Sequence, residues 1–322
     1  MKANGTVSRR SALALLVGVG AFPLARALGA DRSGQFAAET PRPYRLSLPQ
    51  VVADGPQMEV TLSDYGAYQG GAILVQVNNV APSGRSRILG RTSPLVATPG
   101  RGLSGFVPFG TEDPTGFSEL RVEVDSYTAG FEYRSFAIQV LKTAWTIDYI
   151  TIPPPNPNDP DPPPPDLPDE QPRLNELYRG VTPRRWRPKW LAPLPEPLAV
   201  SGYFGEQRSF NGGPVQGHHG GTDFGYAAGT PVTATNDGTV VLAERVRVRG
   251  YCVVIDHGGG VFSLYGHQQS LNVVAGQSVS QGDIVGFVGS TGLSTGPHLH
   301  WELAVAGVLV DGLRWLDGSQ RF

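Results

Sequence analysis

The feature that most restricts how this 322-residue chain can fold is a proline-rich, acidic run near its middle, from Pro153 to Pro172. Proline has a fixed φ and no N–H to donate, so a run this dense joins neither a helix nor a sheet, and it lacks the apolar side chains of a core. Consecutive prolines favour an extended polyproline II conformation, and about 3.1 Å per residue gives the run a reach on the order of 60 Å. The sequence therefore predicts a semi-rigid linker at residues 151–173 that separates two folded domains.

A connector at residues 174–193 follows the predicted linker. We expect a short helix from Leu174 to Arg179. Trp186 and Trp190 stand among prolines and arginines, and large aromatic side chains bury the most area when they pack against a neighbouring core. We therefore expect these two tryptophans to pack the connector onto the last domain, at residues 194–322.

Glycine and proline are both abundant, with 42 and 29 residues, which is typical of short strands joined by tight turns. We therefore expect a mainly β protein, and a hydrophobic content of 40% is sufficient for ordinary cores. The formal net charge is -2, with 26 basic and 28 acidic residues. This balance provides no basic surface that would attract phosphates, so we expect no nucleic-acid partner.

Short apolar runs separated by turn residues occupy residues 43–150. Examples are Ala72–Val77, Glu119–Val124, in which polar and apolar residues alternate, and Phe136–Val140. Such runs are typical of short strands, and their series predicts a β-sandwich of immunoglobulin-like type. The region contains no histidine and no acid pair at motif spacing, so the sequence assigns it no chemistry.

Residues 1–30 have the pattern of an export signal. Lys2, Arg9 and Arg10 precede an apolar run from Ala12 to Leu24, and small residues follow as they do at a signal-peptidase site. The run is short for a bilayer span, so an uncleaved anchor is the alternative and not the first interpretation. The paired arginines also resemble a twin-arginine signal, and both this route and the general secretory route stay open. We expect an exported protein of the periplasm or the extracellular cell envelope.

Cys252 is the single cysteine, so no intrachain disulfide can form. It lies in the apolar, strand-like run Tyr251–Ile255, whereas nucleophilic thiols lie in polar, electropositive surroundings. We therefore expect Cys252 to be a core residue and not the nucleophile of a cysteine peptidase.

The histidines are all concentrated in residues 194–322. In a strand that begins near His298, the side chains of His298, His300 and Glu302 lie on one face, while the intervening apolar residues lie on the other and face a core. His219 and Asp223 share a face in the same way if their segment is extended. Imidazole and carboxylate groups on shared faces can converge on one metal ion, so the pattern predicts a metal site.

Four motifs then occur in order along this region. They resemble the ordered signature of the LytM/lysostaphin-type zinc metallopeptidases, over roughly the last 120 residues of the chain. The resemblance implies a largely antiparallel β fold, the duplicated hybrid motif, for residues 194–322, and activity on the peptide part of bacterial peptidoglycan. Exported relatives with a β-sandwich ahead of the peptidase are similar in layout. The motifs are Gly217–Gly225, Gly229–Ala234, Leu264–His267 and Thr295–Trp301.

The resemblance also implies that His219, Asp223 and His300 bind one zinc ion and that His267 and His298 stand unligated beside it. Three protein ligands leave a coordination position open, as in catalytic zinc sites. A general base and a donor toward the oxyanion or leaving amine are then needed, and His267 and His298 suit these tasks in either order.

Two further histidines, His218 and His257, remain to be assigned. His218 adjoins His219, but only His219 has Asp223 four residues later as the motif requires, so we expect His219 to be the ligand. His257 precedes three glycines, and we expect it to be a turn histidine at a strand end rather than a ligand.

The sequence thus predicts an exported zinc endopeptidase that cleaves peptide cross-links or stems of peptidoglycan, with envelope proteins as further partners. The first alternative is a catalytically inactive relative that binds the cell wall or activates an amidase. The second is a structural or adhesive protein in which the β-sandwich is the working part. The occupied positions of all five key residues favour the enzyme.

Overall fold

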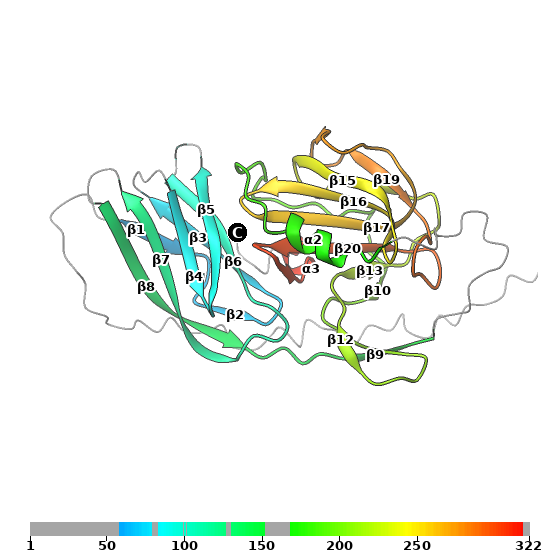
Figure 1. Cartoon of the computed structure of the whole chain (residues 1–322), viewed down its shortest axis with the longest axis horizontal. Helices are drawn as coiled ribbons and strands as arrows, with labels where there is room; N and C mark the ends of the chain where they lie inside the picture. The colour runs from blue at the N-terminus through cyan, green and yellow to red at the C-terminus, as the bar shows by residue number, and fades with distance from the viewer. Residues whose placement is uncertain are drawn as a thin grey trace, which may run out of the picture. The chain divides into compact units, whose positions relative to one another are not determined.

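The computed structural model describes residues 58–78, 83–98, 100, 102–126, 130–151 and 168–317, all within one compact unit of residues 41–322 (Figure 1). The proposed export signal and most of the proposed linker, residues 152–167, lie outside the described residues. Within them, strands greatly outnumber helices, so the prediction of a mainly β protein is confirmed. No helix of these described ranges is long and apolar enough to cross a membrane.

The first sheet has eight strands in the order β1-β3-β6-β5-β4-β7-β8-β2, and β5 pairs with both β4 and β6. The alternating residues predicted to form strands do so, because one face of each strand enters a common core that includes Ile73, Leu120 and Ile138. The immunoglobulin-like type of this domain stays a prediction. The strands are β1 Glu59–Leu62, β2 Gly66–Tyr68, β3 Ala72–Asn78, β4 Ser83–Ile88, β5 Arg91–Thr98, β6 Gly102–Pro108, β7 Gly116–Ser126 and β8 Gly130–Leu141.

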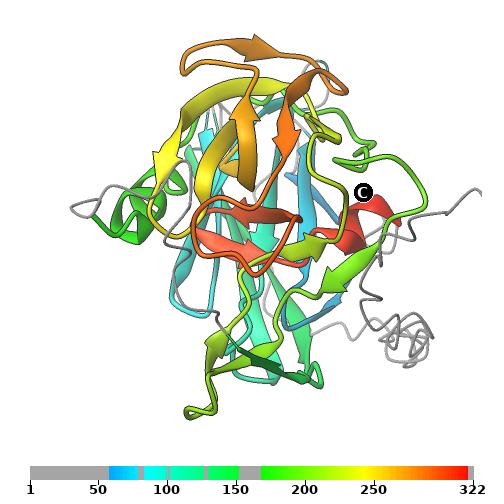
Figure 2. The same ribbon diagram turned by 90° about the vertical axis from the view of Figure 1, so that its right-hand side faces the viewer.

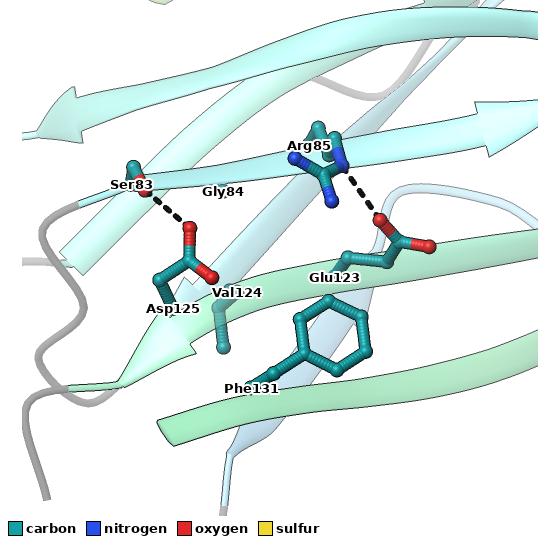
Figure 3. A pocket seen from close by; sticks show the side chains of 7 residues that line it. All are labelled: Ser83, Gly84, Arg85, Glu123, Val124, Asp125 and Phe131. Carbon is teal, nitrogen blue, oxygen red and sulfur yellow. Dashed lines mark hydrogen bonds and ion pairs between the residues drawn. The ribbon is translucent and has the colours of Figure 1, made fainter. Parts of the chain in front are cut away.

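A small polar pocket of about 90 Å³ opens on β4, β7 and β8 (Figure 3). Its charges are already paired, since Arg85 Nε donates to Glu123 Oε2 at 2.6 Å and Ser83 donates to Asp125 at 2.9 Å. None of its lining residues is a histidine or a cysteine. The lining residues are Ser83, Gly84, Arg85, Glu123, Val124, Asp125 and Phe131.

The second sheet has ten strands, and every strand pair in it is antiparallel, as the resemblance implies. Its central strands β16, β17 and β20 are almost wholly buried, which fits their near-continuous apolar sequences. The strands are β10 Val200–Gly202, β13 Thr222–Phe224, β14 Pro231–Thr233, β15 Gly238–Val246, β16 Gly250–Gly258, β17 Val261–Leu271, β18 Ser278–Val279, β19 Ile284–Val288, β20 Leu299–Val305 and β21 Val308–Val310.

A third, three-stranded sheet joins the segment after the first sheet to the segment before His219 (Figures 1 and 2). β9 (Ile147–Ile150) pairs in parallel with β11 (Gln207–Phe210), which pairs with β12 (Gln216–His218) in antiparallel fashion. Just before β9, the Trp145 ring packs edge-on against Phe204 and His218. Residues that lead into the predicted metal site are therefore braced by residues 145–150.

The connector packs against the second sheet. Its helix α2 (Gln171–Leu177) begins three residues before the predicted start, because Pro172 fits the first helical turn, where no N–H partner is required. Residues 170–173, which the sequence assigned to the linker, therefore belong to the connector: Glu170 is the buried residue before the helix, and the helix itself begins at Gln171. Leu174 and Tyr178 are buried against Leu242 and Phe262. The other helix of the described chain, α3 (Leu313–Leu316), carries Trp315.

Trp186 and Trp190 are buried with Trp315 and Val261, so the prediction that they anchor the connector to the last domain is confirmed. The same cluster includes Phe106 of β6, whose ring centroid lies 4.5 Å from that of Trp315. The first and second sheets therefore share a hydrophobic cluster.

Two residues judged structural from sequence are both buried. Cys252 lies in β16, and burial raises the pKa of its thiol well above the ordinary range, as expected for a core residue. His257 is the penultimate residue of β16 rather than part of a turn, with Nδ1 2.8 Å from the carbonyl oxygen of Asp237 and Nε2 2.7 Å from Ser263 Oγ. Burial lowers the pKa of His257 to about 4.

We predict that His257 makes the fold sensitive to acid. Below pH ~6.5 the unfolded chain protonates this histidine and the folded chain does not, so the stability it contributes is complete above that pH and is lost as the pH falls toward 4. The loss amounts to about 3 kcal/mol. In His257→Asn, urea unfolding between pH 6 and 4.5 should show a pH slope lower by up to ~1.4 kcal/mol per unit. An unchanged slope would contradict this assignment, whatever the variant's absolute stability.

Candidate metal centre

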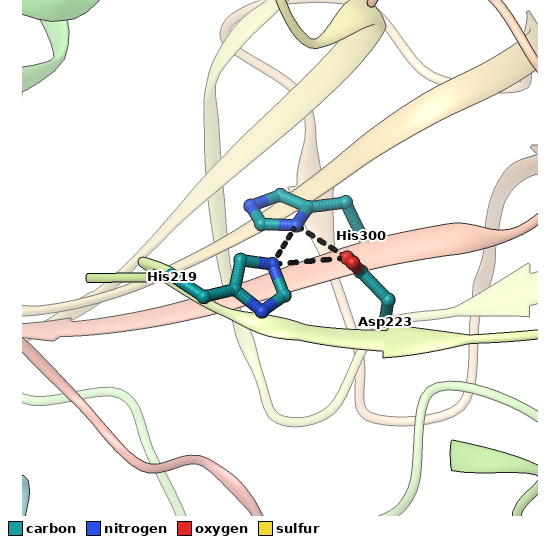
Figure 4. Close-up of side chains that lie close together, drawn as sticks. All are labelled: His219, Asp223 and His300. Atoms are coloured by element: carbon teal, nitrogen blue, oxygen red, sulfur yellow. Dashed lines mark hydrogen bonds and ion pairs between the residues drawn. The ribbon is translucent and has the colours of Figure 1, made fainter. Parts of the chain in front are cut away.

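Two neighbouring strands and the turn before them bring three predicted ligands together. Asp223 of β13 and His300 of β20 are direct cross-strand partners in the antiparallel register, so their side chains lie on the same face. His219 directly follows β12 and reaches the same point from four residues before Asp223. Figure 4 shows the three side chains pointing toward one another.

The atoms that could bind a metal are close to one another. Asp223 Oδ1 lies 2.7 Å from His300 Nδ1 and 3.2 Å from His219 Nε2, and the two imidazole nitrogens are 3.1 Å apart. Two imidazoles and one carboxylate are ligands that zinc accepts.

Hydrogen bonds on the far side of each ring determine which nitrogen faces the centre. His219 donates from Nδ1 to the carbonyl oxygen of Tyr203 at 2.9 Å, and His300 donates from Nε2 to Glu302 Oε1 at 3.0 Å. His219 Nε2 and His300 Nδ1 then both face Asp223 Oδ1, so the three atoms that could bind a cation converge on one point. These residues therefore fit a zinc ion.

Burial and neighbouring charge act on the pKa values of all three groups. Burial lowers the pKa of His219. Burial alone would also lower the pKa of His300, but the hydrogen bonds and negative charges of Asp223 and Glu302 outweigh it and raise the pKa. Burial would raise the pKa of Asp223, but the neighbouring His219 and His300 hold it well below its usual range, so Asp223 is a carboxylate anion.

Two further residues contact the centre, and sequence reasoning did not assign either of them. Arg208 of β11 donates from Nη2 to Asp223 Oδ2 at 2.9 Å, so the carboxylate is held on the side away from the histidines. Glu302 was placed on the same face as His300, and it is a wholly buried carboxylate that accepts from His300. The alternation pattern could have suggested Glu302, whereas no local signal marks Arg208.

His267 and His298 lie together beside these ligands. Their ring centroids are 4.6 Å apart, and the His267 centroid is 5.8 Å from that of His300. His267 donates from Nδ1 to the carbonyl oxygen of Thr291 at 2.7 Å, and His298 donates from Nδ1 to that of Gly296 at 2.8 Å. Each ring therefore keeps Nε2 available, and His298 Nε2 lies 3.9 Å from Asp223 Oδ1.

His267 is held in an unusual environment. Its φ of 59° is in the left-handed region, which costs a non-glycine residue energy and is often found at functional sites. Its backbone N–H donates to the carbonyl oxygen of Arg249 at 2.6 Å, which stabilises that conformation. Burial, together with the nearby His298 and His300, lowers the pKa of His267 to about 3, so its imidazole is neutral near pH 7.

His218 points away from the centre. Its Nδ1 lies 2.7 Å from the carbonyl oxygen of Gly205, its Nε2 pairs with Glu112, and its ring packs edge-on against Trp145. The structure therefore places His219, and not His218, beside Asp223. His257 is likewise engaged elsewhere, with Asp237 and Ser263.

Comparison with known proteins agrees with the resemblance seen in the sequence. Residues 217–312 match the sequence model of Peptidase family M23. The peptidoglycan DD-endopeptidase ShyA of Vibrio cholerae is 44% identical over 96 residues, which cover 30% of this chain and 22% of ShyA. The murein hydrolase activator EnvC of Escherichia coli is 40% identical over 92 residues, or 29% of this chain and 22% of EnvC. The match thus spans about a fifth of each curated relative.

A solved structure extends the likeness beyond these residues. A Pseudomonas aeruginosa protein classed as a peptidase M23 is 25% identical, with a TM-score of 0.56, and the match covers 77% of this chain and 94% of the other. The predicted resemblance is therefore confirmed: the chain contains a LytM-type domain of the M23 family at residues 217–312.

We predict that His219 contributes to metal binding and that the adjacent His218 does not. Replacing His219 with alanine removes a nitrogen from the centre, and zinc affinity should fall more than about 100-fold, since even losing an outer partner of a ligand costs 10- to 100-fold. His218→Ala should keep zinc affinity within about 3-fold, because His218 faces Glu112 and Gly205. Competition with a chromophoric chelator measures both values. Equal losses in the two variants would refute the assignment of His219.

Proposed function

Taking residues 217–312 as a Peptidase family M23 domain, we propose that this protein is an exported endopeptidase that hydrolyses peptide cross-links or stems of bacterial peptidoglycan with one zinc ion. The observation that carries the proposal is the convergence of His219, Asp223 and His300 next to the paired rings of His267 and His298. The peptidoglycan substrate is supported by the name of ShyA and by the family.

The donor set suits catalysis rather than a purely structural role. His219, Asp223 and His300 provide three ligands, and structural zinc sites are closed by four. A zinc ion held there would supply Lewis acidity, which polarises a peptide carbonyl and lowers the pKa of water toward neutrality. Arg208 would hold Asp223 in position, because it binds the carboxylate oxygen that faces away from the histidines.

His267 and His298 would act as the general acid–base groups. Each donates from Nδ1 to a backbone carbonyl, so each presents an Nε2 lone pair that can accept a proton from water. An Nε2 that has gained a proton can then donate it to the leaving amine. The rings contact each other, so one can accept the proton of water while the other, when its Nε2 carries a proton, donates to the developing oxyanion or the leaving amine.

The proposed location follows from the substrate. Peptidoglycan lies outside the cytoplasmic membrane, so residues 1–30 would act as the export signal by either the twin-arginine or the general secretory route. Envelope proteins are then the available partners.

The second candidate is an inactive activator of another hydrolase, because EnvC is named as a murein hydrolase activator. The presence of all three ligand residues and both additional histidines favours the enzyme, since an activator would need neither a zinc site nor a proton acceptor.

We predict that purified mature protein releases muropeptides from isolated peptidoglycan and that two substitutions inactivate it for different reasons. His219→Ala should lose zinc and activity together. His298→Ala should retain zinc and lose about 100- to 10,000-fold in rate, as expected when a general acid–base group is removed. Mass spectrometry of the products identifies the cleaved bond, and zinc quantification accompanies each assay.

His218→Ala is the matched control, because it alters a neighbouring histidine outside the centre and should retain activity. If the parent binds zinc but releases no muropeptides, the endopeptidase proposal fails. Stimulation of a separate amidase by the same protein would then favour the activator.

A further inference from the structure

Behind His300 lies a buried carboxylate that joins the metal centre to the connector. Glu302 is two residues further along β20, is wholly buried, and accepts from His300 Nε2 through Oε1 at 3.0 Å. Arg249 Nε donates to the same oxygen at 2.6 Å, and the hydroxyl of Tyr178 donates to Oε2 at 2.9 Å. Both oxygens of Glu302 are therefore engaged by residues outside its own strand.

The connector also holds Arg249 from the other side. Glu170, the residue before α2, is buried and accepts from Arg249 Nη1 at 3.2 Å and from the backbone N–H of Arg249 at 3.1 Å. Gln171 Oε1 accepts from Arg249 Nη2 at 3.0 Å. Because Glu170 precedes α2 and Tyr178 follows it, the helix contacts this network at both of its ends.

The arrangement gives His300 a defined orientation. A histidine that donates from Nε2 to a carboxylate presents Nδ1 to its other neighbour, and an outer partner of this kind both orients the ring and raises its basicity. The Glu302 carboxylate can do so only while its position is maintained, since a buried carboxylate without partners is strongly unfavourable. Tyr178 and Arg249 supply those partners, and Glu170 holds Arg249.

We propose that Tyr178 and Glu170 of the connector are positioning residues of the metal centre: through Glu302 they hold the Nε2–H of His300 and so direct its Nδ1 toward the metal. The proposal rests on the zinc site of the proposed function. Residues 170–178 lie outside the segment that matches the M23 family. Under this proposal they nevertheless contribute to the peptidase by positioning a metal ligand.

The second sheet offers a matched control in Tyr265. It is also wholly buried, and its hydroxyl makes hydrogen bonds to Thr235 and Ser263 at 2.9 Å. Within the described part of the chain, its hydroxyl does not bond to Glu302 or His300. Tyr178→Phe and Tyr265→Phe each remove one buried hydroxyl from the same domain. A merely structural role for Tyr178 predicts equal effects of the two changes on the metal centre.

The test uses the full mature chain, with zinc alone as the probe. Zinc affinity is measured by chelator competition for the parent, Tyr178→Phe, Glu170→Gln and Tyr265→Phe, and thermal unfolding confirms that each variant is folded. NMR of the zinc-loaded proteins follows the Nε2–H proton of His300. We expect Tyr178→Phe and Glu170→Gln to weaken zinc binding about 10-fold, and this proton to shift upfield and exchange faster with water. Tyr265→Phe should change only the unfolding temperature.

Other results would overturn the proposal. Parental zinc affinity and an unchanged Nε2–H signal in Tyr178→Phe would show that the connector does not act on His300. Equal weakening by Tyr178→Phe and Tyr265→Phe would show a general loosening of the domain. A parent that binds no zinc would remove the premise. A parent that binds zinc without cleaving peptidoglycan would refute the proposed function alone, because neither readout here depends on activity.

Discussion

The antiparallel pairing of β13 with β20 is the interaction on which the candidate centre depends. It sets Asp223 directly opposite His300, and it does so only in the observed register, since a shift by one residue would turn one of the two side chains to the opposite face. The pairing is stabilised by the core on the other face, where Phe224, Leu299 and Trp301 are almost fully buried. The hydrophobic effect on one face thus fixes the relative positions of the candidate metal ligands on the other.

Acidic side chains alternate with basic side chains along the network of contacts at the centre. Arg208 binds Asp223, His300 lies between Asp223 and Glu302, and Arg249 lies between Glu302 and Glu170. A buried charge is tolerated when partners of opposite sign and hydrogen bonds replace its water. In such a network, removal of one member leaves its neighbour unpaired, so effects on the centre can begin several contacts away.

Segments outside the M23 match hold the centre at two points. β9 pairs with β11, which carries Arg208, and the connector reaches Glu302 and Arg249 through Tyr178 and Glu170. The tryptophans of the connector pack with Phe106 of the first sheet in the same cluster. The candidate metal centre is therefore contacted by residues that lie outside the segment matching the family.

The sequence by itself determined the mainly β class, the core role of Cys252, the anchoring tryptophans and the five residues now found around one point. Strand alternation placed His298, His300 and Glu302 on one face, whereas the resemblance to the metallopeptidase family supplied His267 and the choice of His219 over His218. Only the tertiary structure decided the roles of Arg208, Tyr178 and Glu170. Tyr178 and Glu302 are 124 residues apart, and Glu170 and Arg249 are 79 apart, so no local pattern links them. Their contacts exist because the tertiary fold brings α2 and Arg208 of β11 to the second sheet, where they meet side chains distant in the sequence.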